Sequence, residues 1–186
     1  QTYTGMSGTT PLGTFHTRSK GVGDTKISGM FRLFDDNGHH VHINLGVSLP
    51  TGATKKSASV LMPTGMVMEK RLPYGMQLGS GSVDALVGLT YTGFNSAGWN
   101  WGMQYRGRIP FGENDENYKL GDIHTAPAWL AYSWQPWISL SGRIEGQKQS
   151  RIDGSDALIS GKVPMADSLN YGGDRIIAYA GINLAG

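Results

Sequence analysis

The amino-acid sequence predicts an all-β fold: an antiparallel, up-and-down transmembrane β-barrel of the outer-membrane type that is incomplete in this chain. Three observations predict it. The composition is rich in glycine and poor in charge, long segments alternate apolar and polar residues, and the connections between these segments are alternately short and long. Alternation with a period of two is the pattern of a strand whose two faces meet different surroundings.

The composition disfavours a helical protein. The chain of 186 residues contains 28 glycines, and glycine in a helix interior is destabilising. No segment approaches the ~20 consecutive apolar residues that a membrane-spanning helix needs. The length suits one domain, so we expect residues 1–186 to form a single barrel domain.

Charge and cysteine content exclude several classes of function. The formal net charge is +2 and no basic run stands out, so nucleic-acid binding is not indicated. There is no cysteine, which excludes disulfides, thiolate metal sites and c-type haem attachment. Nothing in the sequence indicates a cofactor.

Alternation between apolar and polar residues recurs along the chain. In the segment 39–50, Val41 and Ile43 take one face, and His40 and His42 take the other. Strands of this length exceed the 5–6 residues usual in soluble sheets and suit the ~9–11 residues that cross a membrane. The pattern predicts seven strands, near 24–35, 39–50, 83–94, 99–110, 124–134, 137–148 and 175–184.

The connections between the predicted strands follow a strict order. Short turns at 36–38, 95–98 and 135–136 alternate with long connections. Outer-membrane barrels have short periplasmic turns and long extracellular loops, whereas a sandwich has no reason to keep this order. We therefore expect long extracellular loops at 51–82, 111–123 and 149–174.

Six aromatic residues lie within a few positions of the short turns. Aromatic side chains are enriched where a barrel meets the membrane–water interface. They predict the periplasmic part of an aromatic girdle, although ordinary hairpin aromatics of a soluble sheet would also explain them. The six are Phe34, Phe94, Trp99, Trp101, Trp134 and Trp137.

The strand count predicts that part of the barrel lies outside this chain. Seven is an odd number, whereas bacterial single-chain barrels close with an even number of strands. An open edge also leaves unpaired backbone groups, which lipid does not tolerate. The end at Leu184-Ala185-Gly186 lacks the aromatic residue that usually terminates such barrels. A wrongly assigned strand is the competing explanation.

Several motifs together resemble the outer-membrane transporter family described as the MetA pathway of phenol degradation. The resemblance covers nearly all of residues 20–184. The motifs that carry it are Gly21-Val22-Gly23-Asp24, Ser48-Leu49-Pro50-Thr51-Gly52, Leu72-Pro73-Tyr74-Gly75-Met76-Gln77-Leu78-Gly79-Ser80-Gly81, Gly88-Leu89-Thr90-Tyr91, Trp99-Asn100-Trp101-Gly102, the segment from Asn114 to Asn117, Tyr118-Lys119-Leu120-Gly121-Asp122 and Ile152-Asp153-Gly154.

The resemblance implies a porin-like barrel in the outer membrane of a Gram-negative bacterium that moves small hydrophobic or aromatic compounds. Its partners would be the outer-membrane lipid and a small organic solute. Two alternatives stay open. One is a structural barrel with a plugged lumen whose long loops bind another envelope protein. The other is a soluble β-sandwich or lectin-like binding module.

The polar face of the predicted strands should line the lumen. This face has five Lys or Arg residues and two Asp or Glu residues. The excess of positive charge favours anions such as aromatic carboxylates or phenolates. The alternative is a network of paired charges that fills a narrow barrel. The lumen candidates are Lys26, Arg32, His40, His42, Asn44, Asp84, Thr90, Thr92, Gln104, Arg106, Arg108, Arg143 and Glu145.

Metal binding and catalysis are weakly indicated. The pair His40 and His42 could reach one metal ion, and methionines in the loop 51–82 could bind copper, but depth separates the two groups. The acids of the loop 111–123 are most simply a solvated cluster. Ser80 lacks the spacing of a nucleophile elbow, so the sequence predicts no enzyme.

Overall fold

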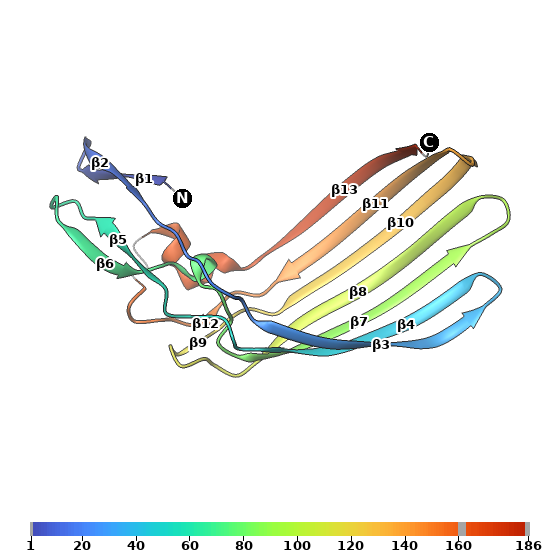
Figure 1. Ribbon diagram of the computed structural model, residues 1–186, viewed down its shortest axis with the longest axis horizontal. Helices are drawn as coiled ribbons and strands as arrows, with labels where there is room; N and C mark the ends of the chain where they lie inside the picture. The colour runs from blue at the N-terminus through green and yellow to red at the C-terminus, as the bar shows by residue number, and fades with distance from the viewer. Residues whose placement is uncertain (1, 160–162, 185–186) are drawn as a thin grey trace.

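The computed structural model describes residues 2–159 and 163–184. Its main element is an antiparallel sheet of seven strands in the order β13-β11-β10-β8-β7-β4-β3, so that strands consecutive among these seven in the chain are neighbours in space (Figure 1). The seven strands are β3 (Thr25–Asp36), β4 (His39–Leu49), β7 (Val83–Phe94), β8 (Trp99–Phe111), β10 (Ile123–Gln135), β11 (Ile138–Gln149) and β13 (Gly173–Leu184).

Each of these strands overlaps a segment predicted from alternation, and the ends differ by no more than two residues. The hairpin between β3 and β4 turns at Asn37 and Gly38, both of which have positive φ. Two bulges, which leave Leu33 and Trp134 without a cross-strand partner, interrupt an otherwise regular register close to the short turns.

The remaining elements gather at the opposite end of the sheet from the short turns, on the left of Figure 1. We call the segments 2–24, 50–82, 112–122 and 150–172, without 160–162, the loop layer. The sequence predicted the loops 51–82, 111–123 and 149–174, made no prediction for residues 2–23, and missed the short elements in all of these segments. They are β1 (Thr2–Ser7), β2 (Thr10–His16), β5 (Ser57–Leu61), β6 (Val67–Arg71), β9 (Tyr118–Lys119), β12 (Asp153–Gly154) and the 3₁₀ turns η1 (Tyr74–Met76), η2 (Pro164–Ala166) and η3 (Ser168–Tyr171).

Cross-strand register gives the long sheet two different faces. In one row, Asn44, Gly88 and Arg106 are neighbours, and polar residues continue along this face. In the next row, Ile43, Leu89 and Tyr105 share the opposite face. We call these the polar face and the apolar face. A one-residue slip would exchange them, so the register is tied to this pattern.

The apolar face is largely exposed. Leu89 in the middle of the sheet is 48% exposed, and Ile176 on the edge strand β13 is 78% exposed. The polar face contains the more buried positions, for example Asp84, which is 1% exposed. Two glycines of the sheet lie beside large side chains. A side chain added at Gly93 would collide with the indole of Trp101, and one added at Gly102 would collide with the indole of Trp129.

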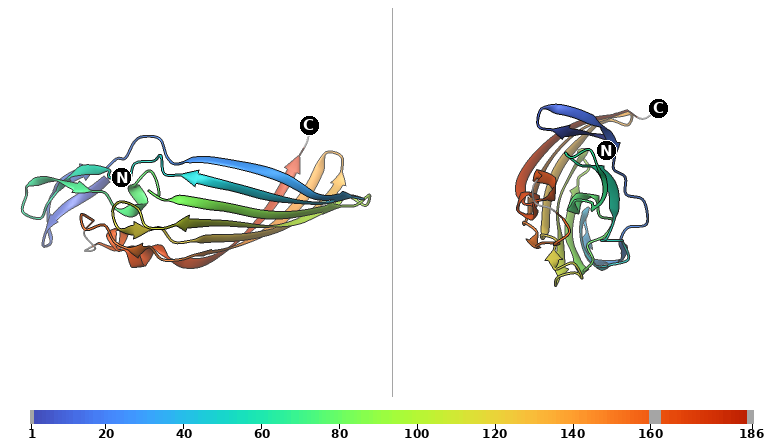
Figure 2. Two further views of the ribbon diagram at one scale, coloured as in Figure 1. Left: turned by 90° about the horizontal axis from the view of Figure 1, so that it is seen from below. Right: turned by 90° about the vertical axis from the view of Figure 1, so that its left-hand side faces the viewer.

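The sheet is a curved trough that is open along its length (Figure 2). Its edge strands, β3 and β13, do not pair with each other in the part of the chain that the structure describes. The inference drawn from residues 185–186 lies outside the described residues. Among residues 2–159 and 163–184, no helix is long and apolar enough to cross a membrane.

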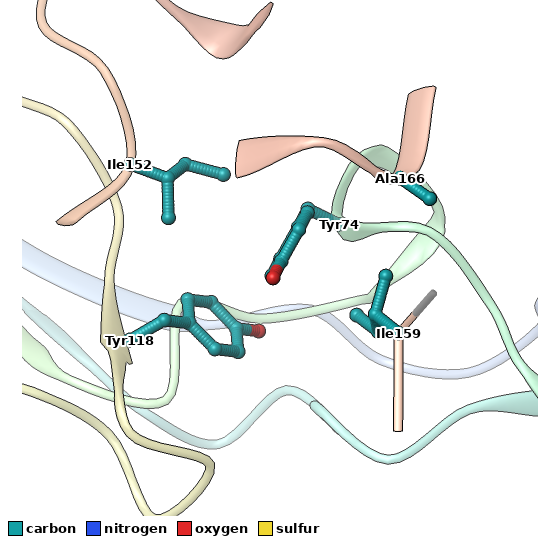
Figure 3. Close-up of a cluster of buried hydrophobic side chains, with 5 residues drawn as sticks. All are labelled: Tyr74, Tyr118, Ile152, Ile159 and Ala166. Atoms are coloured by element: carbon teal, nitrogen blue, oxygen red, sulfur yellow. The ribbon is translucent and has the colours of Figure 1, made fainter. Parts of the chain in front are cut away.

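The hydrophobic core lies in the loop layer and not against the sheet. Tyr74, Tyr118, Ile152, Ile159 and Ala166 form one buried cluster (Figure 3). The rings of Tyr74 and Tyr118 meet edge to face, with their centroids 4.9 Å apart. Segments far apart in sequence therefore fold into one compact layer at the end of the sheet.

Candidate functional site: a polar trough beneath a loop layer

Every predicted lumen residue lies by register on the polar face of the seven-stranded sheet. We call this face the trough. The strand β4 contributes His40, His42 and Asn44, which lie beside Thr92, Thr90 and Gly88 of β7. Asp84 lies further along β7, and the other lumen residues are on β3, β8 and β11. Alternation alone predicted this face because no bulge interrupts these strands between the predicted lumen residues, so each strand keeps its parity there.

A hollow of about 490 Å³ lies over the loop-side half of the trough. Its lining includes the small residues Ser28 and Gly88 and the cations Lys26, Arg106 and Arg108. Glu145 is the only carboxylate that lines it among the described residues. The hollow is therefore polar and net positive, and its volume lies within the range of small-molecule sites.

Glu145 joins two arginines across three strands. Its carboxylate forms an ion pair with Arg143 on its own strand and lies 3.7 Å from Nη2 of Arg106. The guanidinium of Arg143 also lies over the ring of Tyr179, 5.4 Å from its centroid. Tyr179 was not among the predicted lumen residues, because only the pairing of β11 with β13 brings it beside Arg143.

A second polar cluster stands at the loop end of the trough. Asp84 is almost fully buried, and Oγ of Ser82 donates a hydrogen bond of 2.9 Å to it. Nη1 of Arg108 lies 3.9 Å from the same carboxylate, and Ser48 is buried beside it in register. The carboxylate holds Arg108 at the wall of the hollow.

A third cluster occupies the turn end. Asp35 pairs with Arg32 and lies 2.8 Å from Nδ1 of His40. The ring of His40 stacks on Phe94, with centroids 5.9 Å apart. Phe94 thus lies on the polar face by register, which differs from its predicted place in an outward aromatic girdle.

The other girdle candidates are arranged as follows. Trp99 packs against Tyr132 on the apolar face, and Trp101 donates its indole N–H to the hydroxyl of Tyr91 over 3.2 Å. Phe34 and the two tryptophans beside the last turn, Trp134 and Trp137, are half or more exposed. Tyr91 and Tyr132 extend this aromatic band and were missed, because their contacts with Trp101 and Trp99 are made across strands and leave no local signal in the sequence.

The histidine pair and the methionines do not meet. His40 and His42 are on strand β4, whereas Met62, Met66 and Met68 are in or beside the β5–β6 hairpin of the loop layer, and Met76 ends η1. In the parts of the chain that the structure describes, no group of three or more His, Cys, Asp or Glu residues is arranged to hold a metal ion.

Asp24 joins segments of the loop layer next to the point where the long strands begin. One carboxylate oxygen accepts the backbone N–H of Gly52 at 2.9 Å. The other accepts the backbone N–H of Ser80 at 2.7 Å and its hydroxyl at 3.0 Å. Asn114 then donates to the carbonyl of Ser80 at 3.0 Å. The glycine-rich motifs around these residues therefore form a junction where three chain segments approach closely.

Close approach explains why glycines occur at this junction. A side chain on Gly52 would collide with the backbone of Gly79, and one on Gly79 would collide with Asp24 and Gly52. Gly81 has φ +73 and packs against Asn114 and Thr54. Only glycine satisfies both the space and the backbone conformation here.

Two ion pairs lie in the loop layer. Lys55 reaches Glu116 at 2.9 Å, and Arg71 reaches Asp156 at 3.2 Å. Glu116 is buried, so the interpretation of the acids in 111–123 as a solvated cluster is wrong for this residue. Burial raises the pKa of the Tyr118 phenol to about 12, which keeps it neutral.

Glu116 makes the loop layer sensitive to acid. Burial opposes its ionisation, but hydrogen bonds from Lys55 and Thr54 prevail and lower its pKa from 4.5. Its contribution to stability is therefore present above pH 4.5 and is lost as the pH falls through the lower folded-state pKa.

We expect Glu116→Gln to destabilise the loop layer at neutral pH, and we expect its difference from the wild type to shrink at acidic pH. The rate of proteolysis within the segment 111–123, followed from about pH 7 to about pH 3, measures this. Glu113→Gln, an exposed acid in the same loop, is the control and should change little. A Glu116→Gln effect that does not depend on pH would contradict the assignment.

The chain was also compared with known proteins. No protein-family model matches it, and no curated protein matches it either.

Proposed function

We propose that this chain forms part of the wall of an outer-membrane β-barrel that passes small hydrophobic or aromatic organic molecules. The single observation that carries the proposal is the two-faced sheet: seven long antiparallel strands with an exposed apolar face and a polar trough. The motif resemblance to outer-membrane transporters of the phenol-degradation type supports the same function.

The exposed apolar face supports a lipid environment. Leu89, Met103 and Leu130 are each about half exposed or more, although they lie on strands in the middle of the sheet. Continuous apolar patches of this kind on a protein in water mark an interaction surface. A bilayer would bury the whole face without any partner protein.

Strand length supports the same environment. The seven strands have 11–13 residues. At about 3.3 Å per residue, a strand of this length tilted by about 45° spans roughly 28 Å. That matches the apolar band of about 25–30 Å that a membrane barrel presents.

The proposal has one structural requirement. Edge strands in lipid must pair, because their N–H and C=O groups find no water there. β3 and β13 therefore require further strands beside them, from elsewhere in the protein or from another chain. A soluble sandwich would instead cover the apolar face with a second sheet. Within the described residues the additional hairpins lie beyond the strand ends (Figure 1).

The trough supports passage of molecules that carry a negative or partly negative group. Lys26 and Arg108 face the hollow, and Lys26 has no carboxylate within ion-pair distance in the described part of the chain. A ring with a carboxylate or phenolate would meet these cations and would have room beside the small residues Ser28 and Gly88.

A structural barrel with a plugged lumen is the second candidate. The shared pairing of Arg106 and Arg143 with Glu145 favours it, because such networks fill narrow barrels. The two functions differ in whether solute can pass.

Conductance of the purified whole protein in a planar bilayer distinguishes them. Passage predicts discrete conductance steps that benzoate reduces. Glu145→Gln should raise the preference for chloride over potassium several-fold, because it releases two arginines. Asp36→Asn, at an exposed turn, should leave the preference unchanged. A protein that inserts without conducting would support the structural barrel and contradict passage.

A further inference from the structure

A separate apolar pocket of about 410 Å³ lies in the loop layer. It shares no lining residue with the hollow over the trough. Three regions enclose it: the β1–β2 hairpin, the β5–β6 hairpin with η1, and the segment around η2. Its apolar lining includes Phe15, Val60, Met62, Met76, Leu158 and Met165.

The pocket is built for an apolar guest. Three thioethers line it, and methionine adapts its shape and makes favourable contacts with aromatic rings. Phe15 stacks on Tyr3 at one wall, with ring centroids 5.6 Å apart. A volume of this size is in the lower range of sites for small organic ligands.

The polar side chains at the pocket already have partners or are exposed. The hydroxyl of Tyr3 donates to Sδ of Met165 at 3.5 Å, and Oγ1 of Thr17 donates to Sδ of Met76 at 3.7 Å. Arg71 pairs with Asp156. Lys70 is exposed. An ionised guest would therefore find no dedicated partner deep in the pocket, whereas a neutral ring would.

We infer that this pocket binds a small neutral aromatic molecule, such as a phenol or a bicyclic aromatic, at the loop end of the protein. As a first binding site for the transported solute, it rests on the proposed function. The binding itself does not depend on passage. It is a site distinct from the trough, which is polar and cationic.

Methyl NMR of ¹³C-labelled methionine during titration with 2-naphthol tests the site. Ring currents should shift Met62, Met76 and Met165 in a saturable way. Met66 and Met68, which are exposed in the same hairpin, should not move. Met103 on the apolar face reports naphthol dissolved in the surrounding detergent or lipid. Equal shifts at pocket and control methionines would overturn the inference.

A pocket-filling variant gives a matched test. Val60→Trp places an indole in the pocket, whereas Val67→Trp places one on an exposed position of the neighbouring strand. We expect Val60→Trp to weaken naphthol binding at least tenfold and Val67→Trp to leave it unchanged. Unaltered binding by Val60→Trp would overturn the site. The methyl shifts of the unmodified protein test it even if this variant does not fold.

Binding and passage fail separately. A protein that conducts but shows no pocket shifts would overturn the pocket and leave the proposed function standing. A protein that shows the pocket shifts but never conducts would support the pocket and contradict passage.

Discussion

Arginine in place of Leu89 is expected to destabilise the protein in a lipid bilayer by about 2–4 kcal/mol. Leu89 is in the middle of β7, on the apolar face, and is 48% exposed. If lipid covers this face, the substitution places a charge in hydrocarbon, where neither water nor a carboxylate solvates it. If water covers it, an exposed arginine would change stability by no more than about 0.5 kcal/mol.

Gln104→Arg is the matched control for Leu89→Arg. Gln104 is on the adjacent strand β8 at nearly the same depth but faces the trough, where it donates to Thr90 at 2.7 Å. We expect it to cost about 1 kcal/mol, the value of one hydrogen bond. Denaturant titration of both variants in vesicles measures the difference. Equal effects of the two substitutions would contradict a lipid-covered apolar face.

Removal of the Asp24 carboxylate is the second substitution with a large expected effect. Asp24→Ala should destabilise the junction of loop-layer segments by about 4–5 kcal/mol, the lower end of the sum for three charge-assisted hydrogen bonds of about 1.5–3 kcal/mol each, because Asp24 is only half-buried. The carboxylate accepts three such bonds, from the backbone of Gly52 and from the backbone and hydroxyl of Ser80.

Faster cleavage within 51–82 by a protease, together with retained strand signal in circular dichroism, measures a loosened junction. Asp24→Asn should be milder because its amide oxygen still accepts hydrogen bonds. Asp36→Ala at the exposed turn is the control. Among the described residues, the Asp36 carboxylate accepts a side-chain hydrogen bond from Asn37 and from no other residue. Equal protease sensitivity of Asp24→Ala and Asp36→Ala would contradict the role of Asp24.

The long strands were predictable because their signal is local. Each strand alternates over 11–13 residues, and turn residues such as Asn37-Gly38 mark the ends. The loop layer was not predictable in the same way. β5 and β6 have only five residues each, and β9 and β12 have two, so they are too short to show a period.

The polar face was predictable from parity, but its clusters were not. Arg106 and Glu145 are distant in sequence and come together only through the register of three strands. Phe94 illustrates the limit: it borders a turn, as the girdle candidates do, but its parity directs it to His40 on the polar face. The apolar pocket is lined by three regions that are far apart in the sequence, and no local pattern reports such an assembly.

Accessibility of spin labels along β7 tests the central claim most directly. The chain contains no cysteine, so single cysteines can be introduced one at a time from Asp84 to Thr90 and labelled in the whole protein in vesicles. The account predicts that labels at positions 85, 87 and 89 collide with lipid-soluble oxygen. Labels at positions 86 and 90 should collide with a water-soluble nickel complex. Access of the nickel complex to both sets would contradict a lipid-facing apolar surface and the barrel wall with it.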